Sequence, residues 1–262
     1  MAPLGTDRVI ISARRSAFDV GAVYVFGIDG NHRVTLQNPK PEVAKKFGSS
    51  VAAMGSHRIL VGASDDLAGN QGGAVYLFSE DGTLLTTFSN PQAPSASNFG
   101  RSVAALGPDR VLIGAPMEKG FLDPGLAYLF TATGELISTF RKPDERSLDL
   151  FGWSVAALGT DRVLVTSIGD DTGADGAGAA YVFPAPAPPP DPPTLAIARD
   201  TDGIVVSWTD SNQFVLQQSD LQGASPLWEP PIDPITTEGT TRTLRLPVTD
   251  GSPFRFFRLS PP

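Results

Sequence analysis

The sequence predicts an all-β protein: a β-propeller of about four blades, incomplete or open, followed by a small C-terminal β-sandwich. The first observation behind this prediction is a segment that recurs three times, as FGSSVAAMGSHRILVGA (47–63), FGRSVAALGPDRVLIGAP (99–116) and FGWSVAALGTDRVLVTS (151–167). The second is a run of proline that separates these repeats from a final stretch of different sequence. A fixed internal period indicates that one supersecondary unit is stacked several times.

The repeat has a period of 52 residues, measured between Phe47, Phe99 and Phe151. All the tyrosines of the chain fall on one position of this repeat, in GAVYVF, GAVYLF, GLAYLF and GAAYVF, as Tyr24, Tyr76, Tyr128 and Tyr181. Placing a whole residue type on one repeat position by chance is improbable. The period therefore divides the propeller region into units at about 1–46, 47–98, 99–150 and 151–183.

Each full unit contains four short apolar runs, which in the second unit are SVAAM, RILVGA, AVYLF and LLTTF. Runs of this length between polar Gly, Asp and Asn breaks predict β-strands. The pairs Asp29-Gly30, Asp81-Gly82 and Thr133-Gly134 predict hairpin turns, because glycine adopts a positive φ at little steric cost. Four strands in 40–50 residues are typical of one propeller blade.

The order FGxSVA, then VGA(P), then GAVYxF resembles the FG-GAP repeat, the blade unit of the integrin α-chain β-propeller, which is also common in bacterial secreted and surface proteins. This resemblance covers residues 1–183. It implies a non-catalytic, secreted or surface-displayed adhesion module that recognises a protein or glycan ligand through propeller loops. It also implies an extracellular or cell-surface location.

The chain departs from that family where many of its blades carry a DxDxDG calcium loop. The matching connections here offer one carboxylate each or none, whereas calcium takes six to eight oxygen ligands. We therefore expect no cofactor at that family position. A separate calcium hypothesis concerns Asp170, Asp171 and Asp175 in GDDTGADG, where the alternative is ordinary turn chemistry of Asp and Gly.

The proline run PAPAPPPDPP (184–193) predicts a semi-rigid polyproline II spacer and a domain boundary. Residues 194–262 contain five apolar runs: TLAIAR, GIVVSWTD, FVLQQSD, TTRTLRLPV and FRFFRLS. Alternation within VVSW and FVLQQS predicts half-buried strands, with Trp208 as a core residue. The pattern resembles a small fibronectin-III-like β-sandwich.

The N-terminus aligns Met1 with Val51, inside a predicted strand. One hypothesis is that the reading frame begins within a longer one that encodes Phe-Gly-x-Ser, further blades and a signal peptide. The alternative is a true start with a degraded first blade. Residues 1–183 supply about 3.5 blades, so the propeller is either a short closed ring or an open arc whose uncovered faces would self-associate.

Composition excludes several classes of partner. The net charge is −8, with no basic arm, which disfavours nucleic acid and anionic membrane surfaces. No apolar run approaches the roughly 20 residues of a membrane span, so we expect no membrane insertion. The chain has no cysteine, which excludes disulfides, thiolate metal sites and a cysteine nucleophile.

We expect no catalytic residues. His32 and His57 fall in separate predicted turns, and the chain has no nucleophile elbow, HExxH, P-loop or dinucleotide fingerprint. Two alternatives to the binding module stay open. In the first, the chain is a fragment of a propeller hydrolase or lyase whose catalytic residues lie in missing blades. In the second, it is a purely structural envelope spacer.

The connection between the second and third strands is where the repeats differ in length, which predicts the ligand face there. We define the candidate ligand face by the residues of these connections: Arg14, Arg15, Phe18, Asp65, Asp66, Asn70, Met117, Lys119 and Phe121. Trp153 replaces Ser49 and Arg101 in the FGxS frame. It is a candidate recognition aromatic, and packing between blades is the alternative.

Overall fold

The computed structural model divides the chain into two compact units, Met1–Pro189 and Pro190–Pro262. The residues that the structure describes are 1–14, 20–41, 46–64, 72–92, 97–117, 124–144, 146–188, 194–199, 203–209, 215–220, 229–238, 241–246 and 255–260. They contain β-strands and no α-helix, so the predicted all-β class is confirmed. Nor do they contain a helix of the length and apolarity that crossing a membrane requires.

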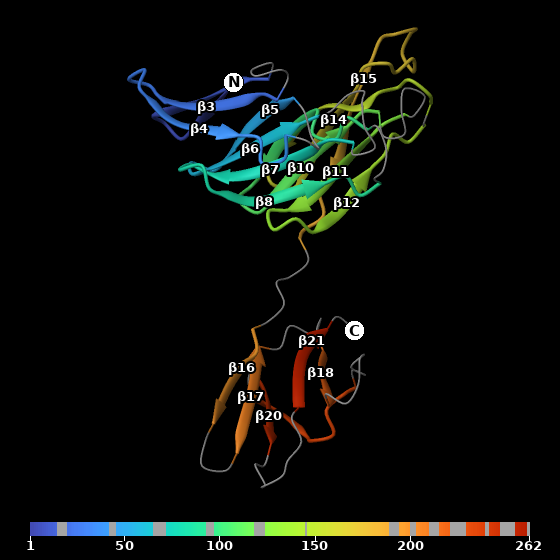
Figure 1. The fold of residues 1–262 in the computed structure, drawn as a ribbon. Helices are drawn as coiled ribbons and strands as arrows, with labels where there is room; N and C mark the ends of the chain where they lie inside the picture. The colour runs from blue at the N-terminus through green and yellow to red at the C-terminus, as the bar shows by residue number, and fades with distance from the viewer. Residues whose placement is uncertain are drawn as a thin grey trace. The chain divides into compact units, whose positions relative to one another are not determined.

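The first unit is built from four antiparallel sheets in which the strands follow chain order (Figure 1). The first sheet has β1 (Ala2–Leu4), β2 (Arg8–Ala13), β3 (Ala22–Gly27) and β4 (His32–Gln37). The second has β5 (Phe47–Met54), β6 (Arg58–Ala63), β7 (Ala74–Ser79) and β8 (Leu84–Ser89). The third has β9 (Ser102–Leu106), β10 (Arg110–Ala115), β11 (Leu126–Thr131) and β12 (Leu136–Phe140).

The fourth sheet has three strands among the described residues: β13 (Phe151–Leu158), β14 (Arg162–Ser167) and β15 (Ala179–Pro184). The predicted four-strand unit is therefore seen three times, and the fourth unit lacks its outermost strand there. The first strands of the blades, rich in Ser, Val and Ala, pack beside one another as β1 on β5, β5 on β9 and β9 on β13. These small side chains allow that close approach. The fold is a β-propeller arrangement of blades, as the repeat predicts.

The phenylalanine of each FG pair anchors its own blade. Phe47, Phe99 and Phe151 have no exposed surface. Each ring packs 5.8–6.1 Å, centroid to centroid, from the tyrosine and from the phenylalanine of the third strand in the same blade. Such aromatic pairs add specificity to the hydrophobic free energy of burial. This contact explains why the tyrosines and the FG pairs share one period.

The glycines of the repeat bring successive blades together. A Cβ on Gly62 would overlap the carbonyl oxygen of Gly100, and a Cβ on Gly114 would overlap that of Gly152. The FGxS serine of the earlier blade also donates a hydrogen bond to this carbonyl of the later blade. Ser50 Oγ donates to the Gly100 carbonyl at 2.8 Å, and Ser102 Oγ donates to the Gly152 carbonyl at 3.1 Å. The glycine and the serine of the motif therefore form one inter-blade contact.

Three hydrophobic cores lie between the four blades. They join the first sheet to the second, the second to the third and the third to the fourth. No core joins the fourth sheet to the first among the described residues. Consistent with this, Val182 on β15 is 51% exposed, whereas its counterpart Leu77 on β7 is 1% exposed. Among the described residues, one face of each terminal blade thus has no partner sheet.

The predicted spacer starts inside the first unit. Pro184 is the last residue of β15, and the Ala185 amide donates to the Asp161 carbonyl at 2.7 Å. Arg110 Nη1 donates to the carbonyl of Pro186 at 2.9 Å. Residues 184–186 are therefore held by the propeller, and residues 189–193 lie outside the described part of the chain.

The second unit is a β-sandwich of two antiparallel sheets. One sheet has the order β16 (Ala196–Arg199), β17 (Ile204–Thr209), β20 (Thr241–Leu246) and β19 (Ile235–Glu238). The other pairs β18 (Val215–Asp220) with β21 (Arg255–Ser260). Val206, Trp208, Leu216 and Leu244 form the core, as predicted for the tryptophan. The order corresponds to strands ABED and CF of immunoglobulin-like sandwiches.

We predict that Gly114→Ala destabilises the propeller by about 1–3 kcal/mol, because a Cβ there forces two blades apart and overpacking costs energy of this size. Chemical denaturation followed by tryptophan fluorescence measures the loss. The matched control is Gly173→Ala, since a Cβ on this exposed glycine has nothing within 4 Å. Equal stability of the two variants would contradict the inter-blade role of Gly114.

Candidate functional site

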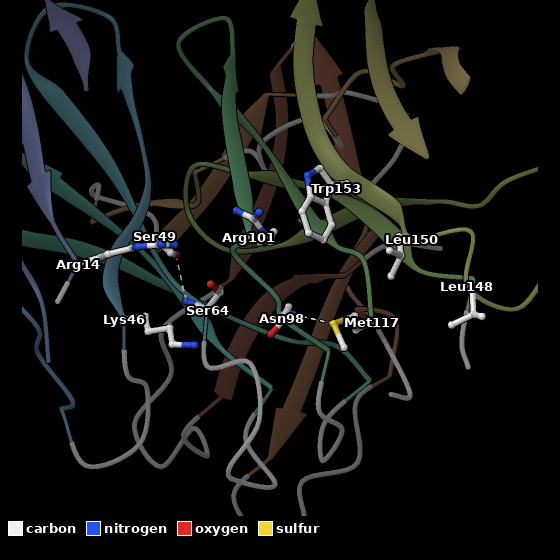
Figure 2. A pocket seen from close by; sticks show the side chains of 10 residues that line it. All are labelled: Arg14, Lys46, Ser49, Ser64, Asn98, Arg101, Met117, Leu148, Leu150 and Trp153. Atoms are coloured by element: carbon white, nitrogen blue, oxygen red, sulfur yellow. Dashed lines mark hydrogen bonds between the residues drawn. The ribbon is translucent and has the colours of Figure 1, made fainter. Parts of the chain in front are cut away.

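A pocket of about 390 Å³ opens where the first three blades meet the start of the fourth. Its lining comes from the residues that precede or begin the first strands and from those that follow the second strands (Figure 2). The lining residues are Arg14, Lys46, Ser49, Ser64, Asn98, Arg101, Met117, Leu148, Leu150 and Trp153. This volume lies in the range of small-ligand sites.

The repeat itself supplies most of this lining. The variable residue of FGxS contributes Ser49, Arg101 and Trp153, and the residue before the phenylalanine contributes Lys46, Asn98 and Leu150. In each blade these two residues are joined by one hydrogen bond, from the amide of the variable residue to the carbonyl three residues earlier, at 2.9, 2.9 and 3.2 Å. The pocket is thus a set of equivalent positions that carry different side chains.

Backbone strain is concentrated at this pocket. The non-glycine residues with positive φ in the described chain are Lys46 (59°), Asn98 (54°), Leu148 (70°) and Leu150 (55°), and all of them line it. Three of them occupy the repeat position before the phenylalanine, so the positive φ at this position is a recurring feature of the blade. Leu148 lies outside this frame and is 52% exposed. Such conformations persist only where the surrounding structure holds them in place.

The polar side of the pocket is cationic. Arg14, Lys46 and Arg101 contribute positive charge, and no carboxylate is among the lining residues. The Arg101 guanidinium lies 4.2 Å from the centroid of the Trp153 ring, a cation–π stack between neighbouring blades. Burial, together with repulsion from Arg14, lowers the pKa of Arg101 from its ordinary value. Both effects disfavour its positive charge, and an anion nearby would offset them.

Asn98 has an unsatisfied acceptor in the same pocket. This side chain is 5% exposed, and its Nδ2 donates to the Met117 sulfur at 2.8 Å (Figure 2). Its Oδ1 is buried without a hydrogen-bond partner among the described residues. An unpaired buried acceptor costs about 1–3 kcal/mol of stability.

The structure brings part of the candidate ligand face together. Arg14, Met117 and Trp153 all line the pocket, whereas the remaining residues, Arg15, Phe18, Asp65, Asp66, Asn70, Lys119 and Phe121, lie outside the described residues. Trp153 lines the pocket and stacks on Arg101 of the neighbouring blade, so it packs between blades, and its role in recognition stays a prediction.

The loop-length argument did not identify Lys46, Asn98 and Arg101. A signal for Arg101 was present, because the repeat has one variable position inside an otherwise constant FGxS motif, whereas Lys46 and Asn98 lie before the phenylalanine, outside that motif. Variation at one position of a constant motif marks a side chain that the fold does not need.

The histidines lie apart from this pocket. His32 Nε2 is 2.8 Å from Thr35 Oγ1, and His57 Nδ1 is 2.9 Å from the Glu80 carboxylate, both on exposed hairpins. Neither histidine is among the lining residues of the pocket.

Asp170, one of the calcium candidates, is part of a buried ionic cluster. Its carboxylate lies 3.0 Å from Lys142 Nζ, which is also 2.9 Å from Asp149, and all three side chains are at most 2% exposed. Asp170 also accepts hydrogen bonds from the Thr172 amide at 2.7 Å and from the Tyr181 hydroxyl. Burial opposes ionisation of Asp170, but these hydrogen bonds together hold its pKa well below the usual range.

The same two repeat positions form a neutral pair one blade earlier. Asn90 and Ser97 occupy the places of Lys142 and Asp149, and Asn90 Nδ2 donates to Ser97 Oγ at 2.9 Å. Both are buried as well. The Lys142–Asp149 ion pair therefore replaces the side-chain hydrogen bond that the third-blade connection forms between Asn90 and Ser97. This replacement occurs where Asp170 is also present.

The other calcium candidates do not converge on Asp170. Asp171 accepts a hydrogen bond from the Gly176 amide at 2.6 Å, and Asp175 is exposed. No group of three His, Cys, Asp or Glu side chains among the described residues is arranged to hold a metal ion. The calcium hypothesis therefore stays a prediction, with Lys142 as a competing cation at Asp170.

Comparison with known proteins supports the repeat assignment for one stretch. Residues 138–183 match the FG-GAP repeat family. No curated protein matches the chain. Among solved structures, a chain from a study of two prolyl endopeptidases aligns with 15% identity and a TM-score of 0.45, over 88% of this chain and 35% of its own. The present chain thus spans about a third of the length of that structure's chain.

We predict that Lys142→Asn destabilises the protein by about 3–5 kcal/mol at neutral pH, because it leaves two buried carboxylates without a counter-ion. The matched control is the double variant Lys142→Asn/Asp149→Ser, which installs the pair found at positions 90 and 97 and should recover part of the loss. Urea denaturation measures both. A double variant that is less stable than the single one would contradict the pairing.

The pH dependence of stability follows from Asp170. Its pKa in the folded state lies below that in the unfolded chain, about 3.9, so the unfolded chain binds more protons in acid. Stability from this group is present above pH 4 and is lost as the pH falls through the folded pKa. Tyr181→Phe removes one donor to Asp170, so its acid-induced loss of stability, followed by circular dichroism, should be smaller than that of the original protein.

We predict that calcium at millimolar concentration raises the melting temperature if Asp170, Asp171 and Asp175 bind it, because ligands of the folded state stabilise it. Lys142→Asn should then increase the shift by removing the competing cation. A melting temperature that is unchanged by calcium and by chelator, in both proteins, would refute the calcium hypothesis.

Proposed function

We propose that this chain is a non-catalytic binding module, secreted or displayed at the cell surface, that recognises a protein or glycan ligand through the pocketed end of its propeller. The observation that carries the proposal is the pocket. It gathers cationic, amide and apolar side chains from successive blades, at repeat positions that the packing of the blades leaves free to vary.

The chemistry of the lining supports binding over catalysis. Acid–base catalysis of hydrolysis or elimination needs carboxyl, histidine or comparable groups that converge on a substrate. The pocket offers two arginines, a lysine, an asparagine and a tryptophan instead. These groups orient an anionic or hydrogen-bonding ligand, and apolar lining with a few polar groups is typical of binding sites. The FG-GAP repeat match at residues 138–183 supports the same class of module.

Substitution of Trp153 tests this proposal. We expect Trp153→Ala to weaken binding about tenfold or more to whichever ligand the full chain selects from a glycan array or a panel of extracellular-matrix proteins, because buried aromatics dominate binding energy. Phe256→Ala is the matched control, since this 43%-exposed aromatic lies in the other unit. Release of cleaved product from a bound ligand would instead favour a hydrolase or lyase, and no binding at all would favour a structural spacer.

We further propose that the uncovered faces of the terminal blades pair with a second copy of the chain. The positions that form each inter-blade core recur on these faces, so a face of the fourth sheet is complementary to the free face of the first. Tyr24 and Phe26 on β3 are partly exposed, whereas their counterparts Tyr76 and Phe78 are buried.

Sedimentation of the full chain tests this association. We expect concentration-dependent dimers or larger species, and we expect Val182→Asp to reduce them, since a charge in an apolar interface is costly. Ile197→Asp is the control, because Ile197 is 67% exposed in the other unit. A chain that stays monomeric at high concentration would refute the proposal.

A further inference from the structure

We propose that Lys142 and Asp149 form an internal amide bond, and that Asp170 accepts the proton that the lysine nitrogen releases as the bond forms. The bond closes the connection that leads from the third blade into the fourth. The reaction takes place once in each chain and needs no ligand, so this inference is independent of the proposed binding function. Three observations carry it: contact between the reacting groups, their burial, and a second carboxylate beside the same nitrogen.

The amine and the carboxyl group that react are already in contact. Lys142 Nζ lies 2.9 Å from Asp149 Oδ2, which places the nitrogen beside the carbon that it attacks. The backbone of Asp149 is held as well, because its carbonyl accepts hydrogen bonds from the Ser167 hydroxyl at 2.7 Å and from the Gly169 amide at 3.0 Å. Groups that are fixed in contact react as if they were at very high concentration, since no entropy is lost in bringing them together.

Burial favours the uncharged forms that the reaction requires. The side chains of Lys142, Asp149 and Asp170 are at most 2% exposed. In water an amine and a carboxylic acid become two stable ions, but a buried site penalises both charges. Transfer of one proton from the Lys142 ammonium to Asp149 gives a neutral amine and a neutral acid. The exclusion of water also protects the amide product from hydrolysis.

The second carboxylate is placed to carry the remaining proton. Asp170 lies 3.0 Å from Lys142 Nζ. It accepts hydrogen bonds from the Thr172 amide and the Tyr181 hydroxyl, which stabilise its charged form. As the nitrogen lone pair forms the N–C bond to Asp149, Asp170 takes a proton from Nζ. Asp170 then passes this proton to the departing hydroxyl, the C–O bond breaks, and one water leaves.

The surroundings of Asp149 also suit the tetrahedral intermediate of this reaction. The Arg146 amide donates to Asp149 Oδ2 at 2.8 Å, so it stabilises the negative charge that develops on this oxygen. The net charge of the cluster does not change, because one positive and one negative charge disappear together. In the product, the new amide N–H remains a donor to Asp170.

The preceding connection shows the same positions without the reactive groups. Asn90 and Ser97 replace Lys142 and Asp149 there, and they form a hydrogen bond at 2.9 Å. Neither side chain is an amine, so no amide can form between them. The amine and the acid occur instead where the chain enters the fourth blade, whose outer face has no partner sheet among the described residues. The bond therefore ties down a blade that packing supports on one face.

Peptide mapping of the full chain tests the proposal. Trypsin cleaves after Arg146, which lies between Lys142 and Asp149. The flanking tryptic peptides cover residues 142–146 and 147–162. If the bond has formed, these peptides are recovered as one branched peptide, and the intact chain is lighter by the mass of one water. Tandem mass spectrometry assigns the branch to the lysine and the aspartate.

Two variants and one control assign the roles. Lys142→Arg keeps the positive charge but removes the amine, so it should give the two separate peptides and the full mass. Asp170→Asn keeps Lys142 and Asp149 as a balanced pair and should lower the fraction of chains that carry the bond at least roughly tenfold, because it removes the proton acceptor. Asp171→Asn is the control, since this exposed neighbour is bonded to the Gly176 amide, and it should leave the fraction unchanged. Circular dichroism shows whether each variant is folded.

Separate peptides and a full mass in the original chain overturn the proposal, and this measurement needs no variant. A chain that is lighter by one water but gives separate peptides overturns it too, because dehydration at an Asp-Gly pair such as Asp81-Gly82 produces the same mass. A branched peptide at the original level in folded Asp170→Asn overturns the role of Asp170. None of these outcomes depends on ligand binding, so the proposed function is tested separately.

Discussion

The close approach of a glycine in one blade to the FG carbonyl of the next is the constraint on which this propeller depends. Gly114 leaves no room for a Cβ beside Gly152, and Ser102 donates to the same Gly152 carbonyl. Backbone contact at this distance brings neighbouring first strands together, and their apolar faces then close into the inter-blade cores. The contact between blades thus requires the glycine and serine residues that recur in the motif.

The separate roles of the motif residues explain why the lining of the pocket can vary while the fold stays constant. Within FGxS, three residues serve packing, and the fourth points into the pocket. Ser49, Arg101 and Trp153 occupy this free position in successive blades, where they provide a hydroxyl, a cation and an aromatic ring. Because each blade contributes one such residue, stacking the blades brings different side chains together at one place, while the approach of glycine to the FG carbonyl of the next blade stays the same.

The fourth blade shows what happens where no further blade follows among the described residues. Thr166 holds the place of Gly114, and its hydroxyl accepts from the Ser154 amide of its own blade at 3.0 Å. The fourth unit also adds Asp170 beside Lys142 and Asp149, a buried cluster in place of the neutral pair Asn90 and Ser97. Hydrogen bonds from the Thr172 amide and Tyr181 satisfy the extra carboxylate, which is what makes its burial tolerable.

The sequence by itself determined the blade unit with its strands and hairpins, because these depend on local periodicity, turn glycines and the 52-residue repeat. It also predicted Arg14, Met117 and Trp153 as candidate ligand-face residues, and all three line the pocket. Only the tertiary structure decided that Arg101 and Asn98 share a cavity with them, and that Lys142 neutralises Asp170. These groups lie many residues apart, and the stacking of blades, which no local pattern encodes, brings them together.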